Sequence, residues 1–218
     1  MSENPTGLRE RKRQRTYRTI SEAAVALFLE KGFAAVSVTE IAEAAQVSKP
    51  TLFRYFPAKE DMALYRFADH EDEAARVVAA RTEGTAPLDA LEAHFLTGLE
   101  ARDPVTGLCD APEVLAFHRL LYGTPSLVAR LHSYTARSED ALAGELAKAA
   151  PAGADPGAGA ELTARLAAGQ IVTVQRVLAT ENWRRISEGA DAESLYPPSR
   201  RDARKAFALL RSGLTPYA

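Results

Sequence analysis

Residues 37–56, Ser-Val-Thr-Glu-Ile-Ala-Glu-Ala-Ala-Gln-Val-Ser-Lys-Pro-Thr-Leu-Phe-Arg-Tyr-Phe, have the pattern of two short helices joined by a tight turn. Ser37 followed by Glu40 is a capping box, in which the serine hydroxyl and the glutamate carboxylate each accept from the other residue's amide. Ser48 can cap a second helix, and Pro50 falls in its first turn, where a missing amide proton costs nothing. The stretch therefore predicts a helix-turn-helix.

The two predicted helices have distinct inward and outward sides. Ile41, Ala44 and Ala45 form the apolar face of the first, while Leu52 and Phe56 face inward from the second. The outward side of the second helix mixes cationic, hydroxyl and aromatic groups, and the DNA major groove, roughly 12 Å wide, admits one such helix. We predict that bases are contacted by Lys49, Pro50, Phe53 and Arg54. We predict that phosphates are held by Thr39, Ser48, Thr51, Tyr55 and Lys59.

This stretch resembles the TetR family of bacterial one-component repressors, most closely over residues 48–56, with Lys59 and Glu60 just beyond. The resemblance covers about the first quarter of the chain and implies a DNA-binding domain, which we place at residues 9–58. The family usually has glycine where this chain has Gln46. If Gln46 takes a positive φ there, we expect strain of about 1 kcal/mol, which a packed turn can absorb.

A basic run precedes the helix-turn-helix, from Arg9 through Arg15 and on to Arg18. Such a run can lie along phosphates and release counterions, which adds affinity and salt dependence without reading sequence. The alternative is a solvated helix start. Beside a helix-turn-helix, contact with DNA is the better interpretation.

A first helix should lead into the helix-turn-helix and complete a three-helix domain. Its inward positions follow helical spacing at Ile20, Ala24, Leu27 and Phe28. Gly32 can then take the left-handed conformation that ends helices, and Phe33 is placed to pack back on Phe28.

Charge and composition limit the function classes. The 218 residues carry 27 basic and 29 acidic groups, so net charge alone does not indicate a nucleic-acid binder. Residues 1–60 hold 10 basic against 7 acidic groups and the remainder 17 against 22, so the basic excess lies where DNA would bind. Cys109 is the only cysteine, which fits a reducing cytoplasm. No stretch has the length of a membrane helix or signal peptide, so we expect a cytoplasmic protein with no membrane partner.

The rest of the chain predicts helices and no strands, hence an all-α fold class. Helical patterns cover residues 57–80, 88–101, 114–121, 126–148, 161–186 and 201–210. Residues 151–159 are a low-complexity connection that we expect to be flexible. We place a larger helical domain for effector binding and dimerisation at residues 59–215.

Residues 161–186 and 201–214 are the predicted dimer interface. The first carries apolar groups on more than one face, at Leu162, Leu166, Ile171, Val172, Val174, Val177 and Leu178. The second offers a partner surface of Ala203, Ala206, Phe207, Leu210 and Leu214. A helix apolar on two faces must be covered on two sides, and the TetR resemblance implies a four-helix bundle in a homodimer, which suits a palindromic operator. The alternative is that both faces belong to the chain's own core.

Catalytic and metal-binding patterns are missing from the sequence. His70, His94, His118 and His132 lie far apart, and no H-E-x-x-H or paired-cysteine spacing occurs. Residues 69–73 form an acidic cluster that fits a solvated helix face better than a cation site. We therefore predict no enzyme, no metal site and no cofactor.

The larger domain is expected to hold a small-molecule effector. Aromatic walls with a few polar tips are usual in such sites, and the candidates are Phe95, Phe117, His118, Tyr122, Gln175 and Trp183. The alternative for each is an ordinary place in the core. Residues 118–127, together with Trp183, resemble an actinobacterial-type TetR subgroup that includes a regulator responding to long-chain acyl-coenzyme A.

Two functional hypotheses remain. The first is a ligand-responsive dimeric repressor, with the helix at 57–80 as the lever that an effector moves. The second is an enzyme or carrier with an incidental helical N-terminus. The outward set of Lys49, Thr51, Arg54, Tyr55 and Lys59 favours the repressor, because a carrier does not need it.

Overall fold

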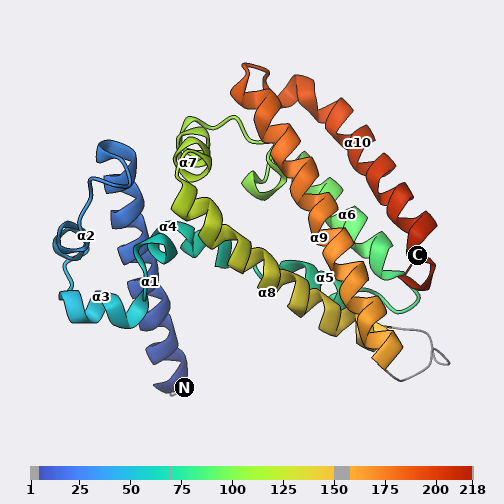
Figure 1. Cartoon of the computed structure of the whole chain (residues 1–218), viewed down its shortest axis with the longest axis horizontal. Helices are drawn as coiled ribbons and strands as arrows, with labels where there is room; N and C mark the ends of the chain where they lie inside the picture. Colours follow the sequence, from blue (N-terminus) through green and yellow to red (C-terminus); the bar gives the residue numbers. More distant parts are fainter. Residues whose placement is uncertain (1–4, 69, 150–157, 218) are drawn as a thin grey trace. The chain divides into compact units, whose positions relative to one another are not determined.

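The computed structural model describes residues 5–68, 70–149 and 158–217, and every regular element within them is a helix, which confirms the all-α class (Figure 1). The α-helices are α1 (Pro5–Lys31), α2 (Val38–Ala44), α3 (Lys49–Tyr55), α4 (Lys59–Ala68), α5 (Glu73–Ala80), α6 (Pro87–Glu100), α7 (Pro112–Tyr122), α8 (Pro125–Ala149), α9 (Ala158–Ser187) and α10 (Ala192–Gly213). Two short 3₁₀ helices are η1 (Pro104–Thr106) and η2 (Thr215–Tyr217). In the ranges given above, no helix is both long and apolar enough to cross a membrane.

The chain forms two compact units. The described residues of the first unit are 5–68 and 116–133, and those of the second are 70–115, 134–149 and 158–217. The division falls inside α7 and inside α8, so one helical hairpin contributes to both units. The predicted domains at 9–58 and 59–215 stay a prediction.

The first unit is built on α1. Figure 1 shows α2 and α3 beside α1, and α4 packs against it as well. Ile20, Ala24 and Phe28 of α1 are buried with apolar groups from the three shorter helices. Gly32 ends α1 with φ 84°, and the Phe28 and Phe33 rings lie 4.9 Å apart, which confirms both predictions for this turn.

The second unit is a helical layer in which α10 packs against α6 and α9, and α5 against α6. Figure 1 shows α9 and α10 running side by side. The core between them includes Ile171, Ala203, Phe207 and Leu210, and the ring of Phe95 on α6 lies 6.3 Å from that of Phe207.

The single helix predicted at 57–80 is wrong. α4 ends at Ala68, residues 70–72 form a turn, and α5 begins at Glu73. The physical reason lies in residues 69–72, Asp-His-Glu-Asp, which offer no apolar group for burial and include poor helix formers. The predicted lever is therefore interrupted.

The last helix begins earlier than predicted, at Ala192 rather than Arg201. Its cap is Asp191, whose side chain accepts from the Ser194 amide at 2.8 Å. Pro197 and Pro198 lie inside the helix, where they remove two amide donors. The cap and the burial of Ala192 nevertheless stabilise the start of the helix. The predicted connection at 151–159 lies outside the described residues up to 157, and α9 already begins at Ala158.

Candidate nucleic-acid interface

The predicted caps of the helix-turn-helix are confirmed. The Ser37 hydroxyl accepts from the Glu40 amide at 3.2 Å, and the Ser37 amide donates to the Glu40 carboxylate at 2.8 Å. That backbone hydrogen bond, with a further one from Lys31, lowers the pKa of Glu40 to about 2. At α3, the Ser48 hydroxyl accepts from the Thr51 amide at 3.2 Å, with Pro50 in the first turn. Both short helices therefore begin where local hydrogen bonds fix them.

The turn between α2 and α3 depends on Gln46. Its φ is 55°, so the positive φ that was considered for this position does occur. The Gln46 amide donates to the Glu43 carbonyl at 3.0 Å, and the Val47 amide donates to the Ala42 carbonyl at 2.9 Å. These bonds satisfy carbonyls at the end of α2 and hold the non-glycine residue in a strained conformation.

The outward side of α3 is open to solvent. Leu52 is fully buried beneath it, while Phe53 is 43 % exposed and Arg54 is exposed as well. Ser48, Lys49 and Pro50 are also exposed, as is Thr39 on α2, whereas Thr51, Tyr55 and Lys59 are half-buried. The structure thus brings the predicted base-contacting groups together on one short helix. On α2 the buried alanines are Ala42 and Ala45, so the prediction of an inward Ala44 is wrong.

Tyr55 belongs to an aromatic cluster centred on Tyr17 of α1. The Tyr17 ring lies edge-on to Tyr55 at 4.8 Å and to Phe56 at 5.2 Å, and stacks on Tyr65 at 5.4 Å. The Arg54 guanidinium lies 5.6 Å from the centroid of the Tyr55 ring. Tyr17 was not among the residues predicted from the sequence. Its spacing of three and seven residues from the inward Ile20 and Ala24 is the signal that could have identified it.

Lys59 has a structural environment that the sequence did not indicate. Its ammonium donates to the Phe33 carbonyl and, at 2.5 Å, to the Val36 carbonyl. It also lies 4.4 Å from the centroid of the Phe33 ring, and burial lowers its pKa. Two of its three donors are therefore used within the domain. The predicted phosphate contact stays a prediction and depends on the third.

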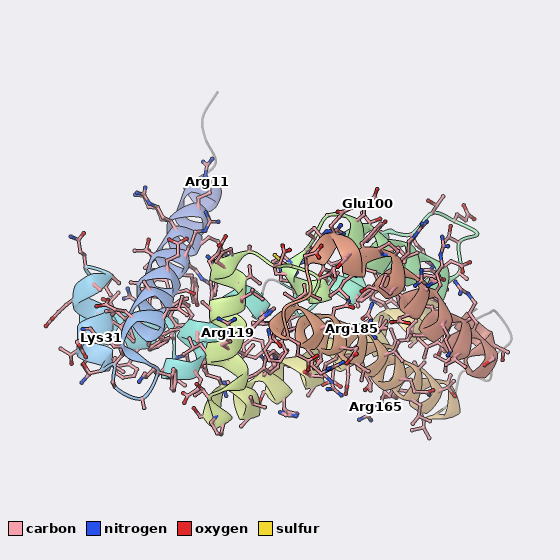
Figure 2. All side chains as sticks on the ribbon, turned by 90° about the horizontal axis from the view of Figure 1, so that it is seen from above. Arg11, Lys31, Glu100, Arg119, Arg165 and Arg185 are labelled. Atoms are coloured by element: carbon pink, nitrogen blue, oxygen red, sulfur yellow. The ribbon has the colours of Figure 1, made fainter. Side chains whose placement is uncertain are left out.

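The basic run lies on an exposed face of α1. Figure 2 shows Arg11 near the start of this helix and Lys31 at its other end. A shallow hollow on the helix is lined by Arg11, Gln14, Arg15, Arg18, Thr19 and Glu22. The side chains of Arg11, Arg15 and Arg18 are exposed, and their contact with phosphates stays a prediction.

The predicted effector-binding residues fall into two groups. Phe117, His118 and Tyr122 lie on α7 in the first unit, where the Phe117 ring lies 6.1 Å from that of Phe67 on α4. His118 is buried, and burial lowers its pKa. The second unit holds Phe95, Gln175 and Trp183. Phe95 is 6 % exposed within the core, and a shared effector site for all six stays a prediction.

The two apolar faces predicted for α9 are confirmed. Ile171 and Val172 are buried, whereas Leu162, Leu166 and Val177 are 57 %, 58 % and 52 % exposed. On α10, the surface predicted to cover one face of α9 is confirmed, because α10 packs against α9 as well as α6. Its side chains at Ala203, Phe207, Leu210 and Leu214 are buried in the chain's own core, so Leu210 does not face a second copy. The large apolar side chain that α10 exposes is Leu209, at 66 %.

Metal-ligand geometry is not found in the part of the chain that the structure describes. No group of three or more His, Cys, Asp or Glu side chains there is arranged to hold a metal ion. The nearest approach is a hydrogen-bonded cluster, in which Glu73 contacts His70 at 2.8 Å and His94 at 3.1 Å.

Comparison with known proteins supports a regulatory family. The model of the family described as "Bacterial regulatory proteins, tetR family" matches residues 20–65, which run from α1 into α4. The chain is 35 % identical over 146 residues to the HTH-type transcriptional regulator TcmR of Streptomyces glaucescens, covering 66 % of this chain and 63 % of that protein. The chain therefore spans just under two thirds of the length of this relative.

Solved structures share the fold. A TetR-family regulator from Streptomyces coelicolor A3 has a TM-score of 0.53 and 22 % identity, over 90 % of this chain and 95 % of its own. The regulator FadR from Bacillus subtilis, in complex with stearoyl-CoA, has a TM-score of 0.52 and 19 % identity, over 90 % and 98 %. The capped helix-turn-helix thus lies within residues 20–65, the stretch that matches the tetR family of bacterial regulatory proteins, and the chain as a whole shares the fold of these solved structures.

Proposed function

We propose that this protein is a dimeric transcriptional repressor that binds a palindromic operator and is released from it by a small hydrophobic effector. The observation that carries the proposal is α3, a helix capped by Ser48 with Leu52 buried beneath it and Lys49, Phe53 and Arg54 exposed. A helix of this kind presents its N-terminal side chains to base edges in the major groove.

The proposed DNA-contacting side chains fall into two sets, one that contacts bases and one that contacts phosphates. Arg54 can form the bidentate contact with guanine that gives most sequence discrimination, and Lys49 is placed to reach a neighbouring base. Thr39, Ser48, Thr51 and Tyr55 would fix the register through phosphates, which carry no sequence information themselves. Exposed arginines of α1 would add to the salt-dependent part of the affinity.

Dimerisation would place two copies of α3 on one face of the duplex. The exposed leucines and valine of α9 and Leu209 of α10 are apolar side chains that a second copy would cover. A two-fold dimer matches a palindromic operator when its reading helices lie about 34 Å apart, one turn of DNA. This surface replaces the predicted one that included Leu210.

The effector would act by binding more tightly to the DNA-incompetent state. Phe117, His118 and Tyr122 in the first unit and Phe95, Gln175 and Trp183 in the second are the proposed contacts. Linkage then requires operator DNA to weaken effector binding by the same factor, typically about 5- to 150-fold. Long-chain acyl-coenzyme A thioesters are the first compounds to test, given the resemblance of residues 118–127.

The decisive experiment is selection of bound fragments from the host's own DNA by the purified full-length protein. We expect enrichment of a palindromic site whose half-sites lie about one helical turn apart, with affinity that falls steeply as salt rises. Binding to all fragments alike, at every salt concentration, would refute sequence-specific regulation. Effector candidates are then tested by operator affinity with and without each compound.

A further inference from the structure

A buried carboxylate joins two helices that are distant in sequence within the first unit. Asp61 in the first turn of α4 is 6 % exposed. Arg130 of α8 donates to it twice, from Nε to Oδ1 at 2.7 Å and from Nη2 to Oδ2 at 3.0 Å. Oδ2 also accepts from the Ala58 amide at 3.2 Å, so the same carboxylate caps the start of α4.

The chemistry of this pair fixes the position of the two side chains relative to each other. A bidentate arginine–carboxylate contact fixes both distance and plane, which a single point charge does not. A buried carboxylate that loses its partner is unfavourable, because the cost of removing it from water is then no longer offset by the ion pair. The start of α4 is therefore tied to Arg130, and hence to α8.

A second contact holds the other end of α4 to the same hairpin. The ring of Phe67, in the last turn of α4, stacks on Phe117 of α7 at 6.1 Å. Both ends of α4 are thus held by residues 116–133, although these lie far along the chain from the helix-turn-helix.

The start of α4 is connected in turn to the helices that face DNA. Lys59, two residues before Asp61, donates to the carbonyls of Phe33 and Val36, in the loop that leads into α2. Ser21 of α1 donates to the Met62 carbonyl at 2.8 Å. A displacement of Asp61 would therefore alter the hydrogen bonds that α4 makes with α1 and with the loop before α2.

We propose that Arg130 is a positioning residue for DNA binding, which acts through Asp61 to set α4 and, with it, the α2–α3 pair. α8 is uninterrupted from Pro125 to Ala149, whereas the path from α4 to α5 is broken at residues 70–72. α8, like α7, is thus a continuous helix with residues in both units. This inference deepens the proposed function and rests on it for its operator readout.

The test compares full-length Arg130→Gln with Arg137→Gln. Arg137 lies on the same helix and pairs with Glu71 at 2.6 Å, but belongs to the second unit, so it is a matched control. Hydrogen exchange is measured for every helix, together with affinity for the selected operator. For Arg130→Gln we expect about tenfold faster exchange in α4 and in α2–α3, unchanged exchange in α6, α9 and α10, and about tenfold weaker operator binding.

Three further results are decisive. Arg130→Lys, which keeps the charge but not the bidentate contact, should be intermediate, and it replaces the glutamine variant if that one does not fold. Asp61→Asn keeps an acceptor for the Ala58 amide. If the two residues act as a pair, the double variant Asp61→Asn/Arg130→Gln should lose less operator affinity than the sum of the losses in the two single variants. Faster exchange confined to α8 and the first turn of α4, or an equal effect of Arg137→Gln, overturns the inference.

Hydrogen exchange needs no DNA, so the inference is tested even if no operator is found. Unchanged exchange in α2–α3 with intact operator binding would reject the role of Arg130 and leave the proposed function standing.

Discussion

Tyr17 of α1 lies edge-on against Tyr55 at the end of α3, with ring centroids 4.8 Å apart and ring planes at 82°. The same ring contacts Phe56 and stacks on Tyr65 of α4, so one side chain holds three others. Because Tyr55 is proposed to contact a phosphate, its position on DNA depends on a residue that itself points inward.

Replacement of Tyr17 by alanine should weaken operator binding without changing which bases are preferred. Each aromatic contact contributes roughly 0.5–1.5 kcal/mol, so we expect an affinity loss of about tenfold. Tyr17→Phe keeps the ring contacts and is the control, expected near wild type. The measurement is binding to the operator and to single-base variants of it. Altered base preference in Tyr17→Ala would place Tyr17 in direct contact with DNA instead.

Arg54 and Thr39 should give opposite patterns. Arg54→Ala removes a predicted base contact. The binding free energy for the operator should weaken by about 1–3 kcal/mol, while that for random DNA should change little. Thr39→Ala removes a predicted phosphate contact and should weaken both DNAs alike. Titrations of each variant on both DNAs measure the difference. An equal loss for Arg54→Ala on operator and random DNA excludes its assignment to bases.

Gln46 should tolerate glycine and resist β-branched residues, because its φ is 55°. Gln46→Gly removes backbone strain but adds freedom to the unfolded chain, so we expect a net change within about 0.5 kcal/mol. Gln46→Val should cost roughly 1–3 kcal/mol of unfolding free energy. Denaturant unfolding measures both, and Glu43→Val, at an exposed helical position of α2, controls for the side chain. A harmless Gln46→Val would show that the turn is not constrained as described.

Dimerisation should distinguish Leu166 from Leu210. Leu166 is 58 % exposed on α9, so Leu166→Asp should leave the helices folded, prevent dimer formation and abolish operator binding. Leu210 is 5 % exposed within the chain's own core, so Leu210→Asp should bury an uncompensated carboxylate and unfold the second unit, a cost of several kcal/mol. Sedimentation and circular dichroism together separate the two outcomes. A wild-type chain that sediments as a monomer at micromolar concentration would rule out the proposed dimer.

The stability of the second unit should depend on pH through Glu73. Hydrogen bonds from His70 and His94 hold the pKa of Glu73 well below its usual value, and the bond to Glu73 raises the pKa of His94. Stabilisation by Glu73 is present above its unfolded pKa near 4.5 and is lost as the pH falls through the lowered value. Stabilisation by His94 is complete below about 6.5 and is lost as the pH rises through its raised pKa.

Glu73→Gln should therefore be most destabilising between about pH 4.5 and 6.5, and progressively less so as the pH rises through the raised pKa of His94. Because the groups are partly exposed, we expect about 1 kcal/mol, or roughly 2–4 °C in Tm, at the maximum. Thermal unfolding at half-unit pH steps measures the profile, with the exposed Glu113→Gln as the control. A difference that stays constant across this range would contradict the role of the two imidazoles.

The local features of the helix-turn-helix could be predicted from the residues alone. The caps at Ser37 and Ser48 and the place of Pro50 each depend on hydrogen bonds or backbone sterics within four residues. The positive φ of Gln46 was suggested only by the resemblance to a family that usually has glycine there, and the model of that family matches residues 20–65.

The tertiary structure decided which surfaces and pairs those elements form. Periodicity placed Leu210 on the apolar face of α10, but only the packing of α10 against α6 and α9 showed that this face is buried within the chain itself. The pairing of Asp61 with Arg130, 69 residues apart, leaves no local signal. Spacing along a helix identifies an apolar or charged face, whereas the partner of that face is chosen by how distant segments fill space and satisfy buried charge together.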